Sequence, residues 1–189
     1  INVDSKNVAE IRCGPSFFKI MGLPQEEFPA LPEFGDPNVF NLPQKLLRDG
    51  LKKTAYAIST DETRYVLNGI LFSFKDNKLT MVATDGRRLA LVDVELEFPR
   101  SQEVDVIVPT KCVAELTRLV AEDGELRMSI GENQVAFEVN GKLLVSKLIE
   151  GNYPNYRQVI PGEAKERVAL ERDLFFRAVH RVALLASDK

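Results

Sequence analysis

The sequence predicts an α+β fold, with two helices packed against two antiparallel sheets of about eight strands in all. Two observations favour this fold. Apolar, β-favouring runs are joined by turn dipeptides at Asp76–Asn77, Asp85–Gly86 and Asn140–Gly141. Two further segments open with Pro43 and Pro109 and then carry apolar residues at helical spacing. Strands that follow one another through such short turns pair in antiparallel order.

The first half of the unit is expected to contain one helix and several strands. The helix starts at Pro43, because proline is favoured in the first helical turn. Leu47 and Leu51 belong to its apolar stripe. Asp85–Gly86 is expected to form a tight hairpin turn, because Asp tolerates and Gly favours the positive φ that such a turn requires. The strands are expected at 38–42, 66–74, 79–84, 88–96 and 103–108.

The second half of the unit is expected to add one helix and three strands. Pro109–Thr110 opens this helix, and Gly124 is expected to end it. Val113, Leu116 and Val120 form its buried side. The closing strands are expected at 125–130, 134–140 and 142–150.

Apolar positions recur along the chain at a fixed spacing. Residues 40–59 align with 168–187 at a constant offset of 128 residues, and the strand pair around Gly14 matches the pair around Gly141 at an offset of 127. Such a period indicates a repeated structural unit. The chain is therefore expected to hold the end of one unit, a complete second unit and the start of a third. The boundaries are expected at 1–32, 33–161 and 162–189.

The composition excludes several classes of protein. With 44% hydrophobic and 28% charged residues, the 189-residue chain is typical of a globular protein, and no apolar run approaches the ~20 residues of a membrane span. Ile1–Asn2–Val3–Asp4 does not open a signal peptide. Cys13 and Cys112 are far apart, which fits a reducing cytoplasm better than a disulfide framework. A net charge of −3 argues against a generally basic nucleic-acid binder, but not against a local basic surface.

Residues suited to catalysis are scarce. His180 is the only histidine and is expected to be a solvated helical residue. Asp61–Glu62 is interpreted as a solvated acidic pair in a loop, and Asp85 is explained by its turn. The sequence has no glycine-rich phosphate loop, nucleophile elbow or metal-spaced cluster. We therefore expect a protein without catalytic residues, cofactor or metal ion.

Basic residues gather on one face of the first predicted helix. Lys45, Arg48 and Lys52 are spaced to share that face. On the second helix Lys111 and Arg118 share a face with acidic residues. One interpretation is a solvated outer surface. The alternative is a positive surface for a phosphate backbone, whose contacts would be sequence-independent and salt-sensitive.

Three segments, in matching order and spacing, resemble the bacterial sliding clamp family, the β subunits of the replicative DNA polymerase. They are 64–72 (RYVLNGILF), 82–90 (VATDGRRLA) and 151–161 (GNYPNYRQVIP). The resemblance implies that 33–161 is a complete middle clamp domain. Segments 1–32 and 162–189 would be the end of the first domain with its linker and the beginning of the third.

What the resemblance implies about function is a processivity factor for DNA replication. Two three-domain chains close a homodimer ring around duplex DNA, helices line the hole, and the ring hydrolyses nothing. A clamp loader that uses ATP opens it. The expected DNA-facing residues are Lys45, Arg48, Lys52, Lys111 and Arg118.

The resemblance also implies a groove between the second and third domains. It would take short peptide motifs from the replicative polymerase, the clamp loader and repair proteins. Its other wall would come from third-domain strands that lie beyond Lys189. The residues on the middle-domain side would be Leu67, Thr84, Gly86, Arg87, Arg88, Leu89, Pro154 and Val159, with Arg64 as a further candidate.

Two alternative functions stay open at this point. A peptide-binding scaffold of the same fold that does not encircle DNA would make the basic stripe incidental. An enzyme with a degenerate site would require residues that the sequence does not reveal. A separate interpretation concerns only Asp85–Gly86: a solvated hairpin tip there would remove the groove. Salt-dependent binding to circular DNA separates the scaffold from a clamp.

Overall fold

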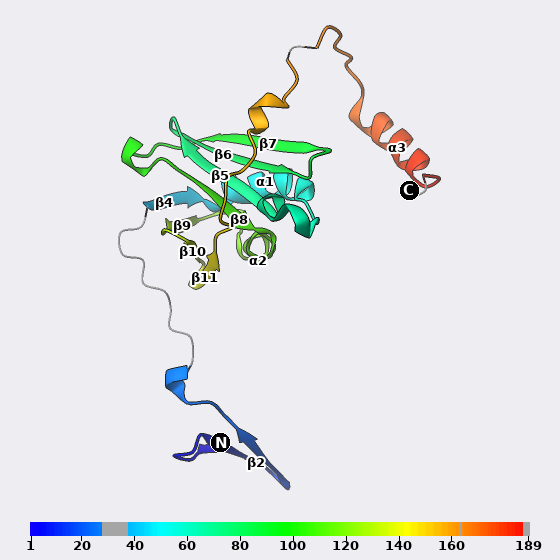
Figure 1. The fold of residues 1–189 in the computed structure, drawn as a ribbon. Coiled ribbons are helices and arrows are strands. Elements are labelled where there is room, and N and C mark those ends of the chain that lie inside the picture. Colours follow the sequence, from blue (N-terminus) through cyan, green and yellow to red (C-terminus); the bar gives the residue numbers. More distant parts are fainter. Residues whose placement is uncertain (28–37, 163, 187–189) are drawn as a thin grey trace. The chain divides into compact units, whose positions relative to one another are not determined.

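The computed structural model describes residues 1–27, 38–162 and 164–186 (Figure 1). The chain divides into two compact units, Ile1–Glu150 and Gly151–Lys189, which we describe separately. The first domain boundary expected from the sequence falls at 32/33, outside the described residues. The three-part division therefore stays a prediction.

The first strands form a small sheet of their own, with strand order β1-β2-β3. Gly14 occupies the turn between β2 and β3 with a positive φ of 55°. The strand pair expected around this glycine is therefore present. The strands are β1 (Asn2–Val3), β2 (Val8–Cys13) and β3 (Ser16–Met21), and a 3₁₀ turn follows at Gln25–Glu27.

Residues 38–147 contain two four-stranded antiparallel sheets and two α-helices (Figure 1). The strand orders are β11-β10-β9-β4 and β7-β6-β5-β8. The predicted α+β fold is thus confirmed. The strands are β4 (Asn38–Pro43), β5 (Gly69–Lys75), β6 (Lys78–Thr84), β7 (Leu89–Glu95), β8 (Val104–Pro109), β9 (Glu125–Ile130), β10 (Gln134–Val139) and β11 (Lys142–Lys147). The helices are α1 (Gln44–Thr54) and α2 (Thr110–Leu119), and 3₁₀ turns lie at Ala55–Ala57, Glu62–Leu67 and Arg100–Gln102.

Both helices pack with their predicted apolar sides inward. Leu47 and Leu51 of α1, and Val113 and Leu116 of α2, belong to the hydrophobic core. Each helix contacts strands of both sheets, and the two helices also contact one another. Each helix follows a proline in extended conformation at the N-cap position rather than in the first turn, so the expected start at Pro43 is one residue early.

Aromatic side chains join the two sheets inside the core. Phe40 of β4 stacks on Phe74 of β5 with ring centroids 3.9 Å apart. Phe98 meets both rings edge-on. Such pairs add about 0.5–1.5 kcal/mol beyond the area they bury. The contact fixes how the two sheets pack on one another.

Two of the three predicted tight turns have the expected geometry. Asp76 and Asn77 (φ 52° and 55°) join β5 to β6, and Asn140 and Gly141 (φ 51° and 72°) join β10 to β11. Positive φ at both central residues is what a two-residue hairpin loop requires.

The expected hairpin around Asp85–Gly86 is confirmed, but the prediction that these two residues form a tight turn is wrong. The strands pair up to Thr84 opposite Leu89, so four residues form the connection. Of these only Gly86 has a positive φ, of 84°. A four-residue loop does not need positive φ at both central positions, and Asp85 instead contributes its side chain, as described below.

The second unit contains a 3₁₀ turn at Tyr156–Gln158 and helix α3 (Arg172–Ala183). Glu171 caps α3 by accepting hydrogen bonds from the N–H groups of Asp173 (3.0 Å) and Leu174 (2.8 Å). The repeat predicted a helix here, and α3 confirms it. Within the described ranges, no helix is long and apolar enough to cross a membrane.

Candidate functional site

The loop between β6 and β7 is held by the side chain of its first residue. Asp85 Oδ1 accepts hydrogen bonds from the backbone N–H groups of Arg87 (2.9 Å) and Arg88 (3.0 Å). Its Oδ2 accepts a third from Arg88 Nε at 3.1 Å. These donors hold the pKa of the Asp85 carboxyl below its usual value, the backbone bond from Arg87 contributing most. The ionised carboxylate therefore fixes the path of the loop.

The Thr84 side chain stabilises the same loop through hydrogen bonds to the loop backbone. Its Oγ1 donates a hydrogen bond to the Arg88 carbonyl oxygen at 2.7 Å. The same oxygen accepts one from the Gly86 N–H at 3.1 Å. The Thr84 hydroxyl is thus engaged within the loop, and its part in the candidate site is to shape the backbone.

Arg64 connects this loop to the 3₁₀ segment before β5. Its Nη2 donates to the Asp85 carbonyl oxygen at 3.0 Å, and its Nε donates to Asp61 Oδ2 at 3.2 Å. A Cβ on Gly86 would lie 2.6 Å from Arg64 Nη1, closer than real Cβ contacts. The structure therefore brings Arg64 and the loop together.

The two arginines of the loop differ in how they are held. The Arg88 guanidinium pairs with Asp85 and lies over the Tyr56 ring, 5.7 Å from its centroid. The Arg87 side chain is exposed and has no ion pair among the described residues. Arg87 is thus the cation of this loop that is available to a ligand.

The two predicted groove leucines lie near the same end of their sheet. β5 pairs with β6, and β6 pairs with β7 through Thr84 and Leu89, so the segment that ends at Leu67 meets the loop there. Leu67 is only 5% exposed, whereas Leu89 is half-buried. Within this unit, Leu89 offers the larger apolar surface of the two.

Pro154 and Val159 belong to the second unit. Both are exposed there, Val159 at 68%. Their approach to the loop stays a prediction.

The basic stripe on α1 is partly neutralised by neighbouring carboxylates. Lys45 Nζ lies 3.2 Å from Asp49 Oδ2, and this hydrogen bond is the main cause that lowers the pKa of Asp49. Arg48 pairs with Glu122, which follows α2. The second pair places the outer faces of the two helices beside one another.

On α2 one of the two predicted cations is also paired. Arg118 Nη1 lies 3.0 Å from Glu115 Oε1. Lys52 and Lys111 are exposed, and neither forms an ion pair in the parts of the chain that the structure covers. These two lysines are therefore the most available positive charges of the five predicted to face DNA.

A sequence profile described as "DNA polymerase III beta subunit, central domain" matches residues 41–155. The chain belongs to this family. The match includes helices α1 and α2 and the loop between β6 and β7, and the resemblance seen in the sequence is confirmed.

Full-length clamps show the same similarity. The beta sliding clamps of Halalkalibacterium halodurans and Bacillus subtilis are 39% and 33% identical to this chain, and each alignment covers 100% of the chain and 50% of the relative. The chain thus spans about half the length of these curated relatives.

Solved clamp structures share the fold. A DNA polymerase sliding clamp from Bacillus subtilis superposes with a TM-score of 0.89 at 31% identity, covering 99% of this chain and 50% of that one. A DnaN sliding clamp from Bartonella birtlesii, bound to griselimycin, superposes with a TM-score of 0.84 at 38% identity, covering 97% and 51%.

Two residues that touch the candidate site in this clamp-family chain were not foreseen. Asp61 was interpreted as a solvated acid, but it pairs with Arg64. Tyr56 lies under Arg88. The spacing of Asp61 and Thr63, typical of a helix cap, was a usable signal for Asp61. Nothing local marks Tyr56, because its contact joins residues far apart in the sequence.

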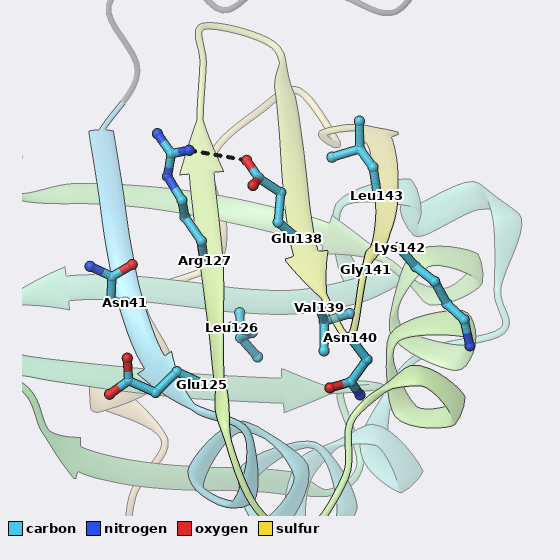
Figure 2. A pocket seen from close by; sticks show the side chains of 10 residues that line it. All are labelled: Asn41, Glu125, Leu126, Arg127, Glu138, Val139, Asn140, Gly141, Lys142 and Leu143. Carbon is cyan, nitrogen blue, oxygen red and sulfur yellow. Dashed lines mark hydrogen bonds and ion pairs between the residues drawn. The ribbon is translucent and has the colours of Figure 1, made fainter.

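A separate hollow of about 560 Å³ lies over the β11-β10-β9-β4 sheet (Figure 2). Arg127 and Glu138 face one another there in an ion pair of 3.2 Å. None of the residues that line this hollow was predicted from the sequence to bind DNA or a peptide. In the described ranges, no group of His, Cys, Asp and Glu side chains is arranged to hold a metal ion.

Proposed function

We propose that this chain is the central part of a DNA sliding clamp subunit, a processivity factor that encircles duplex DNA and tethers the replicative polymerase. The family match over residues 41–155 carries the proposal. The fold supports it, because two adjacent helices each contact both sheets. Two copies of the full-length protein, meaning a chain as long as the curated relatives, would close a homodimer ring.

The DNA side of the ring would be the outer faces of α1 and α2. Contacts to phosphates there would be independent of DNA sequence and sensitive to salt. Lys52 and Lys111 would contribute most, because neither forms an ion pair in the described ranges, whereas the other three cations do. The proposed DNA-facing residues are Lys45, Arg48, Lys52, Lys111 and Arg118.

The loop after β6 would form part of a groove for short peptide motifs of the polymerase, the clamp loader and repair proteins. The griselimycin complex of the Bartonella birtlesii clamp supports a ligand site in this family. We propose that this groove also binds griselimycin. The proposed groove residues are Leu67, Thr84, Gly86, Arg87, Arg88, Leu89, Pro154 and Val159, with Arg64 beside them.

The proposed division of the chain follows from the same function. Residues 1–32 would end the first clamp domain, 33–161 would be the middle domain, and 162–189 would begin the third. We propose a cytoplasmic protein without a catalytic role of its own.

Titration with griselimycin tests the groove. In the full-length protein, Leu89→Glu should weaken binding about 100-fold, because a carboxylate replaces apolar area in the groove. Leu67 is less suitable for this test, since its burial ties it to the fold. Leu143→Glu, at a 47% exposed position on β11, is the matched control and should bind as the unsubstituted protein does. Equal affinity of the Leu89 variant and the control would refute the groove.

One observation favours a second candidate, a peptide-binding scaffold of the same fold that does not encircle DNA. Lys45, Arg48 and Arg118 already have carboxylate partners, which reduces the charge left for phosphates. Retention on closed circular DNA separates the two candidates.

A further inference from the structure

We propose that Asp61 and Arg64 form a positioning pair, which holds the loop Asp85–Arg88 in the conformation that binds a peptide. The proposal rests on the function proposed above. It assigns Arg64 to the support of the loop rather than to the ligand, and it gives Asp61 a role beyond capping its own 3₁₀ segment.

Asp61 orients Arg64 at one end of the pair. Its Oδ1 accepts hydrogen bonds from Thr63 N (3.0 Å) and Thr63 Oγ1 (2.7 Å), and its Oδ2 accepts one from Arg64 Nε (3.2 Å). The two carboxylate oxygens thus have separate tasks. One caps the 3₁₀ segment, and the other fixes a long, otherwise mobile side chain.

Arg64 in turn holds one peptide unit of the loop. Its Nη2 donates to the Asp85 carbonyl oxygen at 3.0 Å, while the N–H of the same peptide unit, that of Gly86, donates to Thr84 Oγ1 at 3.1 Å. The plane of this peptide is therefore fixed from both sides. Because this plane sets φ of Gly86, it influences the direction in which the next residue, Arg87, leaves the loop.

The geometry requires an arginine at position 64. Nε and Nη2 lie on one edge of a rigid guanidinium and reach two different acceptors at once. A lysine ammonium is a single point that cannot hold the same orientation. Gly86 has no side chain to obstruct the guanidinium, since a Cβ there would approach Nη1 to 2.6 Å.

The pair lies outside the hydrophobic core, so its role is separable from stability. The side chains of Arg64 and Asp61 are 48% and 43% exposed, and exposed ion pairs contribute little to folding. Their removal should loosen the loop without unfolding the domain.

The test uses two substitutions in the full-length protein. Asp61→Asn keeps the Oδ1 acceptor of the cap and removes the charge from the Arg64 partner. Arg64→Lys keeps the charge and removes the fork. Arg127→Lys and Glu138→Gln, in an exposed ion pair on another sheet, are the matched controls.

Three quantities are measured: griselimycin affinity by calorimetry, hydrogen exchange of the Gly86, Arg87 and Arg88 amides without ligand, and the melting temperature. We expect affinity to fall about 3-fold for Asp61→Asn and about 10-fold for Arg64→Lys, the scale of an exposed ion pair and of a charged hydrogen bond. Exchange of the loop amides should accelerate in both variants. The melting temperature should not change, and the controls should leave all three quantities unaltered.

Two outcomes would overturn the positioning role. Unchanged affinity and exchange in both variants would show that the loop holds itself. Reduced affinity with unchanged loop exchange would show that Arg64 contacts the ligand directly. Failure of the proposed function would be a different result: the unsubstituted protein would not bind griselimycin. In that case, hydrogen exchange of the loop amides without ligand still decides whether Asp61 and Arg64 hold the loop.

Discussion

Gly86 is needed for two independent reasons. Its φ of 84° lies in the region where a side chain costs about 1–2 kcal/mol, and its missing Cβ makes room for Arg64 Nη1. Gly86→Ala should therefore weaken griselimycin binding about 10-fold through both effects. Arg64→Ala removes only the clash between the new Cβ and the Arg64 guanidinium. In the Arg64→Ala background, Gly86→Ala should therefore cause a smaller further loss of griselimycin affinity. A double-mutant cycle measures the difference, and strictly additive losses would contradict the contact.

The carboxylate of Asp85 gives the loop a defined pH dependence. Its pKa in the folded protein is lowered from 3.8, mainly by the backbone bond from Arg87. The stabilisation is therefore fully present above pH 3.8 and is lost as the pH falls through the lower, folded value. Nuclear magnetic resonance should show the Arg87 and Arg88 amides shifting with the Asp85 carboxyl below that pH. Asp85→Asn should abolish the shift, and a carboxyl that titrates at its ordinary value would contradict the bonding.

At the residue scale, local chemistry predicted only part of the site. The sequence marked Gly86 and the two arginines, because turn and charge signals are local. It left open which arginine is available, since that depends on Asp85 and Tyr56. It also described Asp61 as solvated, because adjacent acids in a loop usually are, and so it missed a partner only three residues away, Arg64.

Gln44 connects several elements through one buried side chain. Gln44 is 2% exposed. Its Oε1 accepts a hydrogen bond from the Ala121 N–H at 2.8 Å. Its Nε2 donates hydrogen bonds to the Glu125 carbonyl oxygen at 3.2 Å and to Asn140 Oδ1 at 3.0 Å. The start of α1 is thereby tied to the end of α2 and to the β10–β11 turn.

Gln44→Leu should lower the free energy of unfolding by about 2–3 kcal/mol, because it leaves buried donors and acceptors unpaired. Chemical denaturation measures the loss. Gln102→Leu, whose side chain has no hydrogen bond among the described residues, should change it by less than about 0.5 kcal/mol. A loss for Gln44→Leu no larger than for the control would show that water replaces these bonds.

The free lysines of α1 and α2 should matter more to DNA than the paired cations. Replacing Lys52 and Lys111 by glutamine should lower the affinity of the full-length protein for duplex DNA, with a salt slope smaller by about 0.9 for each lost phosphate contact. Replacing Lys45 and Arg118 should have a smaller effect, because their carboxylate partners oppose it. Lys142→Gln on β11 is the control. Equal losses from both pairs would contradict this ranking.

At the element scale, the periodic apolar pattern predicted the helices and hairpins, but it did not predict the 3₁₀ segment that precedes β5. Both helices and the Asp76–Asn77 and Asn140–Gly141 hairpins are present where the sequence indicated. Helix α2, however, ends at Leu119 and not at the expected stop, Gly124, because Val120 is already in extended conformation. The strand expected from residue 66 starts at Gly69 instead. The Asp61 cap and the Asn68 N–H bond to the Tyr65 carbonyl close a 3₁₀ turn over an otherwise β-favouring run.

For the whole molecule, the net charge does not decide whether the proposed DNA partner binds. The total of −3 argues against a generally basic nucleic-acid binder, but not against a local basic surface. The proposed helix faces would carry local positive charge while the sum stays negative, and local potential decides binding to a polyanion. The offset of 128 residues predicts a modular chain rather than a single domain, and this division stays a prediction.

The central claim, that the full-length protein encircles DNA, is tested most directly by cutting the DNA. The protein is loaded onto closed circular DNA by a clamp loader and ATP, washed at a salt concentration that removes ordinary phosphate contacts, and then exposed to a nuclease that linearises the circle. A ring should stay on the closed circle at high salt and leave once ends exist. Release from the intact circle by salt alone, or retention that is the same on circular and linear DNA, would contradict encirclement.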